Sequence, residues 1–259
     1  MPSLQLIATA AFGLEAVVVR ELAALGYEAR VVRPGRIAFA ADTQDVCRVN
    51  LWLRSADRVL IELADFEAQD FDALFDTVQT LPWEAWMQAD SAIPVRGRAH
   101  RSQLSSVPAI QRTVKKAIVD RLQARLSKTL PETGPPVAVE ASLVDNRATI
   151  DLDTSGDGLH RRGYRRLTAP AQLRETLAAA LVALSFWKPG RPLIDPFCGS
   201  GTIVIEAALL GRNMAPGRRR RFAAEAWPAI DASHWLRARE EADDKALPPL
   251  KERLIGHDI

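Results

Sequence analysis

The chain has 259 residues, of which 47% are hydrophobic and 25% are charged, and its formal net charge is +2 at pH 7. This composition is typical of a globular protein that is long enough for two or three domains. The small net charge excludes an argument for nucleic-acid binding from total charge, so any such function must come from local basic clusters.

The composition also argues against metal centres, disulfides and membrane spans. The two cysteines, Cys47 and Cys198, lie far apart, form no Cys-x-x-Cys pair and, with four histidines, give no zinc-ligand spacing. No run approaches about 18 apolar residues, and the first residues lack the basic and apolar regions of a signal peptide. We therefore expect a chain without metal or membrane segment in the reducing cytoplasm.

Residues 1–65 are predicted to form a small α+β domain. The expected strands cover 3–8, 27–33, 37–40 and 58–63, and the expected helices cover 13–25 and 42–53. The first helix has apolar residues at helical spacing and a glycine stop, and Asp42 can cap the second. The order β-α-β-β-α-β is the ferredoxin-like split motif. No catalytic constellation is visible in this domain.

Residues 66–155 are predicted to form a second unit. Helices are expected at 70–78 and 82–86, a strand at 93–99, a long helix after Ser106, and a hairpin of strands 137–143 and 148–152. The long helix starts with a serine cap and a proline in its first turn. Its apolar stripe consists of Ile110, Val114, Ile118, Leu122 and Leu126.

Basic residues lie mostly off this stripe, and on charge alone they indicate either a solvated face or an RNA surface. The unit as a whole resembles a THUMP domain, an RNA-binding module. The resemblance rests on Pro82-Trp83, the segments 98–106 and 114–118, and the closing hairpin. It implies that RNA is held mainly through backbone and shape. The residues it implicates in RNA binding are Arg98, Arg101, Lys115 and Lys116.

Residues 156–170 are predicted to be a basic linker. Four arginines and one tyrosine fall within residues 161–166, a pattern typical of phosphate contacts and one stacking ring, or of a solvated linker. The string Gly-Leu-His-Arg-Arg-Gly-Tyr-Arg resembles the entry to the methyltransferase domain of THUMP-linked RNA methyltransferases. It implies RNA contacts from Arg161, Arg162 and Arg165. A helix over 173–186 follows.

The most informative stretch is Pro192 to Thr202, which predicts a short buried strand, a glycine turn and a helix that begins near Thr202. Gly199 and Gly201 allow a close backbone approach, and the helix start offers free N–H groups to a ligand. A P-loop is excluded because no lysine follows Gly201, and a dinucleotide fingerprint fails because Val204 replaces its third glycine. An ordinary tight turn stays open.

The string Asp-Pro-Phe-Cys-Gly-Ser-Gly-Thr resembles motif I of class I S-adenosylmethionine methyltransferases, in the branch that methylates exocyclic amines of nucleic acids. The resemblance implies S-adenosylmethionine as cofactor. Its implied contacts are Asp195, Phe197, Gly199, Gly201 and Thr202. The alternative for Asp195 is a turn or helix cap. Residues 253–259 are predicted as the second strand of this domain, and Asp258 matches the acidic residue that binds the ribose hydroxyls.

Between these strands, Arg218 to Arg221 predict an exposed loop that is either disordered or a phosphate clamp, with Arg219 as an RNA contact. A charged helix is expected over 233–244 with Ser233 as its cap, and Trp227 and Trp235 are expected to be core or lid aromatics.

Residues 171–259 thus predict only the start of an α/β Rossmann-like methyltransferase domain. Two of about seven strands are expected, and the sequence contains no Asn/Asp-Pro-Pro-Tyr motif to hold a target amine. We expect a truncated N-terminal portion of a bacterial enzyme resembling the guanine-N2 methyltransferases of 23S rRNA, inactive by itself. Three alternatives stay open: a non-catalytic RNA-binding module, a tRNA guanine-N2 methyltransferase and a DNA amino-methyltransferase. Oligomeric state is not indicated.

Overall fold

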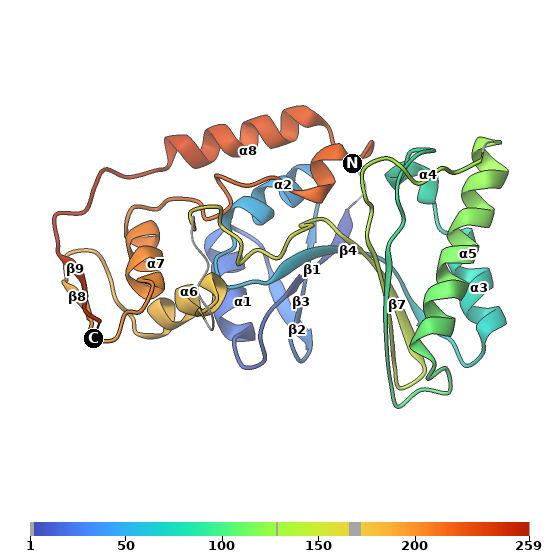
Figure 1. The fold of residues 1–259 in the computed structure, drawn as a ribbon, viewed down its shortest axis with the longest axis horizontal. Helices are drawn as coiled ribbons and strands as arrows, with labels where there is room; N and C mark the ends of the chain where they lie inside the picture. The colour runs from blue at the N-terminus through green and yellow to red at the C-terminus, as the bar shows by residue number, and fades with distance from the viewer. Residues whose placement is uncertain (1–2, 128, 166–171, 259) are drawn as a thin grey trace.

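The computed structural model describes residues 3–127, 129–165 and 172–258, which form two sheets and their surrounding helices (Figure 1). The strands are β1 (Leu4–Thr9), β2 (Ala29–Arg33), β3 (Arg36–Ala41), β4 (Arg58–Glu67), β5 (Val95–His100), β6 (Val139–Val144), β7 (Arg147–Asp153), β8 (Leu193–Asp195) and β9 (Leu254–Gly256). The helices are α1 (Glu15–Ala24), α2 (Thr43–Trp52), α3 (Phe71–Thr80), α4 (Trp83–Trp86), α5 (Val107–Leu126), α6 (Glu175–Leu184), α7 (Thr202–Gly211) and α8 (Ala232–Asp244), with a short 3-10 helix at Ala223–Ala226.

The first unit has the predicted ferredoxin-like order. Strand β1 lies between β3 and β4, and all three are antiparallel, with Ile7 opposite Ala38 and Leu60. Helix α2 begins with a capping box, in which the Asp42 side chain accepts from the Asp45 N–H and Asp45 accepts from the Asp42 N–H, both at 2.9 Å. This reciprocal cap satisfies two N–H groups of the helix start and explains why the helix begins there.

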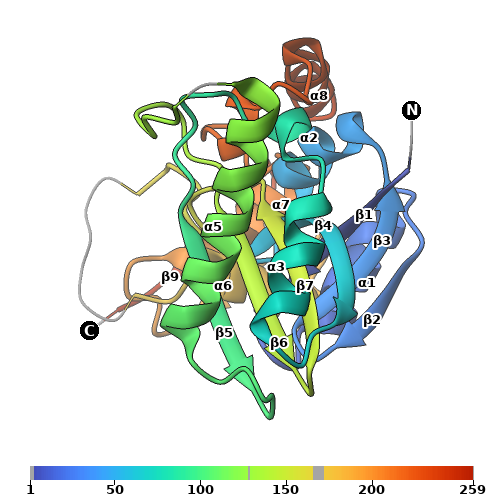
Figure 2. The ribbon, with the colours of Figure 1, turned by 90° about the vertical axis from the view of Figure 1, so that its right-hand side faces the viewer.

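The second unit consists of β5, β6 and β7 with α3, α4 and α5 against one face (Figure 2). Strands β6 and β7 form the predicted hairpin, whose turn residues Asp145 and Asn146 have φ of 52° and 64°. This left-handed conformation matches the twist of a two-residue hairpin and is tolerated by Asp and Asn. Strand β5 is followed by the long helix α5, which buries its apolar stripe, and β6 then pairs parallel to β5.

The two units share one seven-stranded sheet in the order β2-β3-β1-β4-β7-β6-β5. Strand β4 continues to Glu67 and pairs with β7 from Leu60 opposite Asp153 to Glu67 opposite Arg147. Side chains from both units therefore belong to one hydrophobic core on the helix-covered face. The opposite face carries a separate small cluster of Ile7, Ala38 and Leu60, because neighbouring residues of a strand point to opposite sides.

The C-terminal part forms the small parallel pair β8 and β9, with α6 and α7 beside it (Figure 1). Helix α6 also packs on α1 of the first unit, where Ala180 meets Leu14 and Val17.

The segment between α7 and β9 turns back onto the first unit, and α8 lies along α2 (Figure 1). Arg48 of α2 forms an ion pair with Glu241 of α8 at 3.0 Å. Trp227 meets Trp86 edge to face at 6.3 Å, and Trp235 stacks on Phe222 at 5.1 Å. Both tryptophans that we predicted as core or lid residues are buried in the shared core.

The cap of α8 differs from the prediction. Asp231 is the N-cap, and its side chain accepts from the Ser233 N–H at 2.7 Å, so the helix starts one residue earlier than expected. A carboxylate at this position also interacts favourably with the positive end of the helix dipole.

Candidate cofactor and RNA sites

The turn between β8 and α7 is open on the side where a ligand would approach. Gly199 and Gly201 have φ of +50° and +74°, a left-handed conformation that favours glycine. An added Cβ at either position would meet no atom within 4 Å, so the backbone of the turn is accessible. Helix α7 begins at Thr202, and its first N–H groups have no acceptor within the helix.

Asp195 shapes this turn. Its Oδ1 accepts from the Phe197 N–H at 3.2 Å, so one carboxylate oxygen caps the turn, as the alternative reading anticipated. The Asp195 carbonyl accepts from the His257 N–H at 2.9 Å, and the Cys198 N–H donates to the His257 carbonyl at 2.7 Å. The glycine turn is therefore tied to the end of β9, and the Phe197 ring is exposed beside it.

Parallel pairing brings the carboxyl ends of β8 and β9 together, with Asp195 opposite Gly256. Asp258 follows two residues later and is exposed. Gly256 has no room for a side chain, because an added Cβ would lie 2.8 Å from Cys198 Sγ. Cys198 thus packs between the turn and β9.

Thr202 and Arg165 form a contact that the sequence did not indicate. Thr202 is buried, and its hydroxyl accepts from Arg165 Nη2 at 2.7 Å. Arg165 Nε also pairs with Glu175 at 2.7 Å, and the same guanidinium donates to the Leu173 carbonyl. Arg165 was predicted to contact RNA, but its donors are occupied in joining the linker to α6 and to the start of α7.

Arg162 is also structural, which corrects its predicted role. It is buried, donates to the carbonyls of Leu159 (2.8 Å) and Arg54, and lies 3.5 Å from Glu206 of α7. The Tyr164 hydroxyl donates to the same Glu206 carboxylate at 3.1 Å, so this ring anchors the linker to α7. Burial raises the pKa of Glu206, against the opposing effect of Arg162.

Among the described linker residues that we predicted to contact RNA, only Arg161 is exposed, with an ion pair to Asp157 at 3.4 Å. The end of the predicted linker, residues 166–170, lies outside the described residues, as do the predicted limits at residues 1, 171 and 259.

The four basic residues predicted in the THUMP-like unit lie on two different faces. Gly97 faces α5, since an added Cβ would lie 3.0 Å from Gln111 Cγ, and its neighbour Arg98 therefore points to the other face. Arg98 donates to Ser142 at 2.7 Å. On α5, Lys115 pairs with Glu132 at 2.7 Å and Lys116 with Asp120 at 3.3 Å. Arg101 is exposed just after β5, with φ of +49°. The structure does not bring these residues into one site.

The helix-free face of the sheet carries a charged cluster that we did not predict. Arg36 and Asp151 form a buried ion pair at 2.6 Å, and Arg96 reaches Asp153 at 3.1 Å. Burial raises the pKa of Asp151 to about 6, while Arg36 acts in the opposite direction. Arg36, Arg96 and Arg98 border a cavity of about 340 Å³ on this face. Its sequence signal is the pair of charged residues Arg96 and Arg98 at alternate positions of β5.

The arginine run of residues 218–221 is neither wholly exposed nor free of contacts. Arg220 is buried and donates to the carbonyls of Gly158 at 2.7 Å and Ser155 at 3.0 Å. Arg219 is exposed, as predicted. The expectation of a fully exposed loop is thus wrong for Arg220, which fastens the loop to the linker.

The described residues contain neither a metal-binding cluster nor a membrane-spanning helix. No group of three or more His, Cys, Asp or Glu side chains is arranged to hold a metal ion there. Within the same residues, every helix is too short or too polar to cross a membrane.

Three protein families match successive parts of the chain. They are the RlmL ferredoxin-like domain over residues 5–60, the THUMP domain over 68–153, and the RMKL-like methyltransferase domain over 162–259. Their order agrees with the two units of the large sheet and the glycine turn that follows them.

Individual proteins match nearly the whole chain. A Bacillus subtilis (strain 168) protein named "Putative RNA methyltransferase YpsC" is 48% identical over 249 residues, which are 95% of this chain and 64% of that protein. A crystal structure from Listeria monocytogenes str. 4b F2365 is described as a "predicted N6-adenine-specific DNA methylase". It has a TM-score of 0.96 and 48% identity to this chain, and the match covers 100% of this chain and 68% of the Listeria chain. The crystal structure of SMU.472, "a putative methyltransferase complexed with SAH", has a TM-score of 0.93 and 42% identity, with coverages of 100% and 69%.

The chain spans 64% of the length of the curated Bacillus relative. That it is the N-terminal portion of a longer enzyme stays a prediction. With the same domain order, the same fold and 48% identity to a solved structure of which it covers 68%, the chain belongs to the family of THUMP-domain methyltransferases.

Proposed function

We propose that the chain holds RNA with its N-terminal sheet and S-adenosylmethionine at the turn after β8. In this proposal it is part of an enzyme that methylates the exocyclic N2 amine of a guanine in 23S rRNA. The observation that carries the proposal is the direct linkage between the two parts. Arg165 joins the linker to Thr202 at the start of α7, and Tyr164 and Arg162 join it to Glu206 of the same helix.

The residues around the turn fit the cofactor. The open backbone at Gly199 and Gly201 and the N-terminal N–H groups of α7 suit the carboxylate of the methionine part, because helix starts attract anions. Asp258 follows the neighbouring strand, where an acidic side chain can accept from the ribose hydroxyls. Asp195 keeps the turn in shape, and its carboxylate adds an acceptor at the same edge of the sheet.

When bound, S-adenosylmethionine supplies a methyl group already activated by its sulfonium. The chain's own task is then positioning, since an activated donor needs an aligned acceptor more than a strong base. The ion pair of Arg165 with Glu175 and its hydrogen bond to Thr202 fix the start of α7 against α6, so the turn is held relative to the RNA-binding units.

RNA is the proposed substrate because the chain contains a THUMP domain and a relative carries the name of an RNA methyltransferase. The Listeria protein is described as a DNA methylase, so the choice between RNA and DNA requires an experiment. A non-catalytic RNA-binding module is the second candidate. It is favoured by the observation that, among the described residues, the methyltransferase sheet has two strands.

The cofactor assignment is tested by calorimetric titration of S-adenosylmethionine into wild type, Asp195→Ala and Asp195→Asn. Asparagine keeps an oxygen acceptor for the Phe197 N–H, so it separates loss of charge from loss of the turn. We expect about tenfold or greater weakening of cofactor binding in Asp195→Ala and RNA affinity within about twofold of wild type. Asp244→Ala, an exposed change on α8, is the control. Wild-type cofactor affinity in Asp195→Ala would refute the assignment.

The substrate is tested by incubating the enzyme of which this chain is proposed to be part with labelled S-adenosylmethionine and 23S rRNA, tRNA, or DNA of the same sequence as the rRNA. The proposal expects label in 23S rRNA and N2-methylguanine by mass spectrometry of the digested RNA. Label in tRNA or DNA alone would select the corresponding alternative. RNA binding with no label in any substrate would favour the non-catalytic module.

A further inference from the structure

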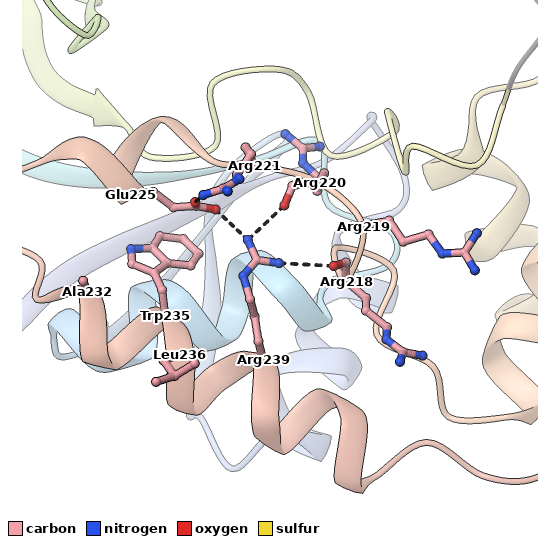
Figure 3. A pocket seen from close by; sticks show the side chains of 9 residues that line it. All are labelled: Arg218, Arg219, Arg220, Arg221, Glu225, Ala232, Trp235, Leu236 and Arg239. Atoms are coloured by element: carbon pink, nitrogen blue, oxygen red, sulfur yellow. Dashed lines mark hydrogen bonds and ion pairs between the residues drawn. The ribbon is translucent and has the colours of Figure 1, made fainter.

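The arginine loop and α8 border an open surface cavity of about 590 Å³ (Figure 3). Arg218 to Arg221 form one side of it, and Arg239 of α8 lies opposite them. Leu236 and Ala232 of α8 add an apolar surface beside the guanidinium groups. The cavity thus combines cationic and apolar walls, the chemistry expected of a site for nucleotides.

Arg239 fixes the shape of the loop (Figure 3). It donates to the carbonyls of Arg218 at 3.1 Å and Arg220 at 3.0 Å, and it pairs with Glu225 at 2.6 Å. One side chain of a helix therefore holds two backbone positions of the loop. A loop ordered before binding loses less conformational entropy when a ligand arrives, so its exposed arginines are preorganised.

Arg220 anchors the loop from the other side. Its guanidinium is buried, donates to the carbonyls of Ser155, Asp157, Gly158 and Arg161 and lies 4.8 Å from the Phe222 ring. Burial lowers the pKa of Arg220 to about 10, so it stays protonated at neutral pH. Among the described residues no carboxylate forms an ion pair with it, and its positive charge adds to the potential of the loop.

The site concentrates positive charge in a chain that has little overall. Five guanidinium groups lie around the cavity, and their ion-pair partners are two carboxylates, Glu225 and Asp243. The local excess is three positive charges, against a net charge of +2 for the whole chain. Such a cluster attracts polyanions even though the protein as a whole does not.

The basic surface extends past the loop toward the cofactor turn. Arg218 and Arg219 also border a second cavity of about 350 Å³ together with Tyr164, Arg212 and residues of α7. Gly163 of the linker lies so close that an added Cβ would be 3.2 Å from the Arg219 carbonyl. Since α7 has ten residues, its far end is about 15 Å from the turn at which it starts. Two adjoining basic cavities suit an extended chain of phosphates better than one small anion.

We propose that the loop 218–221 is a clamp for the phosphate backbone of RNA, with Arg219 and Arg221 as the contacts and Arg220 and Arg239 as the positioning residues. This inference rests on the proposed function, because it places the substrate RNA beside the helix that starts at the cofactor turn. Arg221 is largely exposed and pairs with Glu225 at 2.9 Å, and Arg219 is exposed. Both can therefore reach a phosphate without disturbing the core.

The test compares Arg219→Gln/Arg221→Gln with wild type by fluorescence anisotropy of a labelled single-stranded RNA between about 50 and 200 mM KCl. The control Arg20→Gln/Lys251→Gln removes the same charge from exposed sites on α1 and just before β9, both outside the N-terminal sheet. We expect about tenfold weaker binding for the loop variant. The slope of log K against log salt should fall in magnitude by about 1.4, because each lost phosphate contact removes about 0.7. The control should change affinity less than twofold.

Equal affinities and slopes for the loop variant and the control, with the wild type binding RNA, would overturn the clamp alone. No RNA binding by the wild type would overturn the clamp and the proposed function together. If poly-glutamate displaces the RNA and this displacement also depends on Arg219 and Arg221, the partner of the loop would be an acidic protein and not RNA. Cofactor affinity of the loop variant should equal that of wild type, which separates this test from the cofactor site.

Arg239→Lys tests the scaffold. Lysine keeps the charge but cannot hold two carbonyls and Glu225 together. We expect weaker RNA binding with an unchanged salt slope. If Arg239→Lys binds RNA with wild-type affinity, Arg239 has no positioning role.

Discussion

Replacing Trp235 by alanine tests whether α8 is part of the N-terminal core. Trp235 is 4% exposed, stacks on Phe222 at 5.1 Å and packs where α8 meets α2, whereas the next residue, Leu236, is 59% exposed. These neighbours on one helix form a matched pair. A difference in unfolding free energy between their alanine variants therefore reports the burial of the side chain and not helix propensity.

The magnitude follows from the buried area. A buried tryptophan removes roughly 150–250 Å² from water, worth about 4–6 kcal/mol at about 25 cal/mol per Å². Its Nε1 is buried and has no hydrogen-bond partner among the described residues, and removing that group returns about 1 kcal/mol. We therefore expect Trp235→Ala to lower the free energy of unfolding by about 4 kcal/mol, within the usual range for such changes.

The assay is urea denaturation followed by circular dichroism, supported by thermal unfolding. The expected loss corresponds to a fall in Tm of roughly 10 °C for a chain of this size. Leu236→Ala should stay within about 0.5 kcal/mol of wild type. Trp235→Phe, which keeps an aromatic ring against Phe222, should lie between them. If Trp235→Ala and Leu236→Ala unfold at the same denaturant concentration, α8 does not share the core with α2.

Two further predictions concern titratable side chains. A thiol reagent should modify Cys198 in the folded protein and Cys47 only after denaturation, because burial raises the pKa of Cys47 and shields its thiol. Rapid reaction of both thiols in the folded protein would contradict this. So would an unchanged number of reactive thiols in folded Cys198→Ala. Burial raises the pKa of Glu206 in the folded state, so the protonated carboxyl stabilises the fold at a pH below the ordinary value of about 4.5. This contribution is lost as the pH rises through the raised pKa. In urea titrations from about pH 4 to 7, Glu206→Gln should therefore lose less stability with rising pH than wild type, whereas the exposed control Glu240→Gln should follow wild type. Parallel plots of unfolding free energy against pH for all three proteins would refute the shift.

Local patterns predicted most elements correctly. Asp42 caps α2, the first unit has the predicted β-α-β-β-α-β order, and the glycine turn after Asp195 joins a strand to a helix. These features depend on residues within a few positions of one another, so their physical causes are present in a short stretch of sequence. The resemblance to motif I and to a THUMP domain added the functional reading.

The arginines show where this reasoning failed. Arg162, Arg165 and Arg219 look alike in sequence, yet the first is buried, the second is bound to the starts of α6 and α7, and the third is exposed. A guanidinium group is placed in the interior only when carbonyls and carboxylates from other segments converge on it. Those partners are distant in sequence, as in the pair of Arg36 and Asp151, which are 115 residues apart.

The local elements, the order of the three family-like regions and the residues of the glycine turn could be predicted from short stretches of the chain. The tertiary structure decided that β4 and β7 merge two units into one sheet, that α8 packs on α2, and which arginines stay exposed. The two groups of features differ in how far apart in the sequence their interacting residues lie. Helix caps and turns are satisfied by near neighbours, whereas strand pairing, burial and ion pairs depend on contacts between residues that only the folded chain brings together.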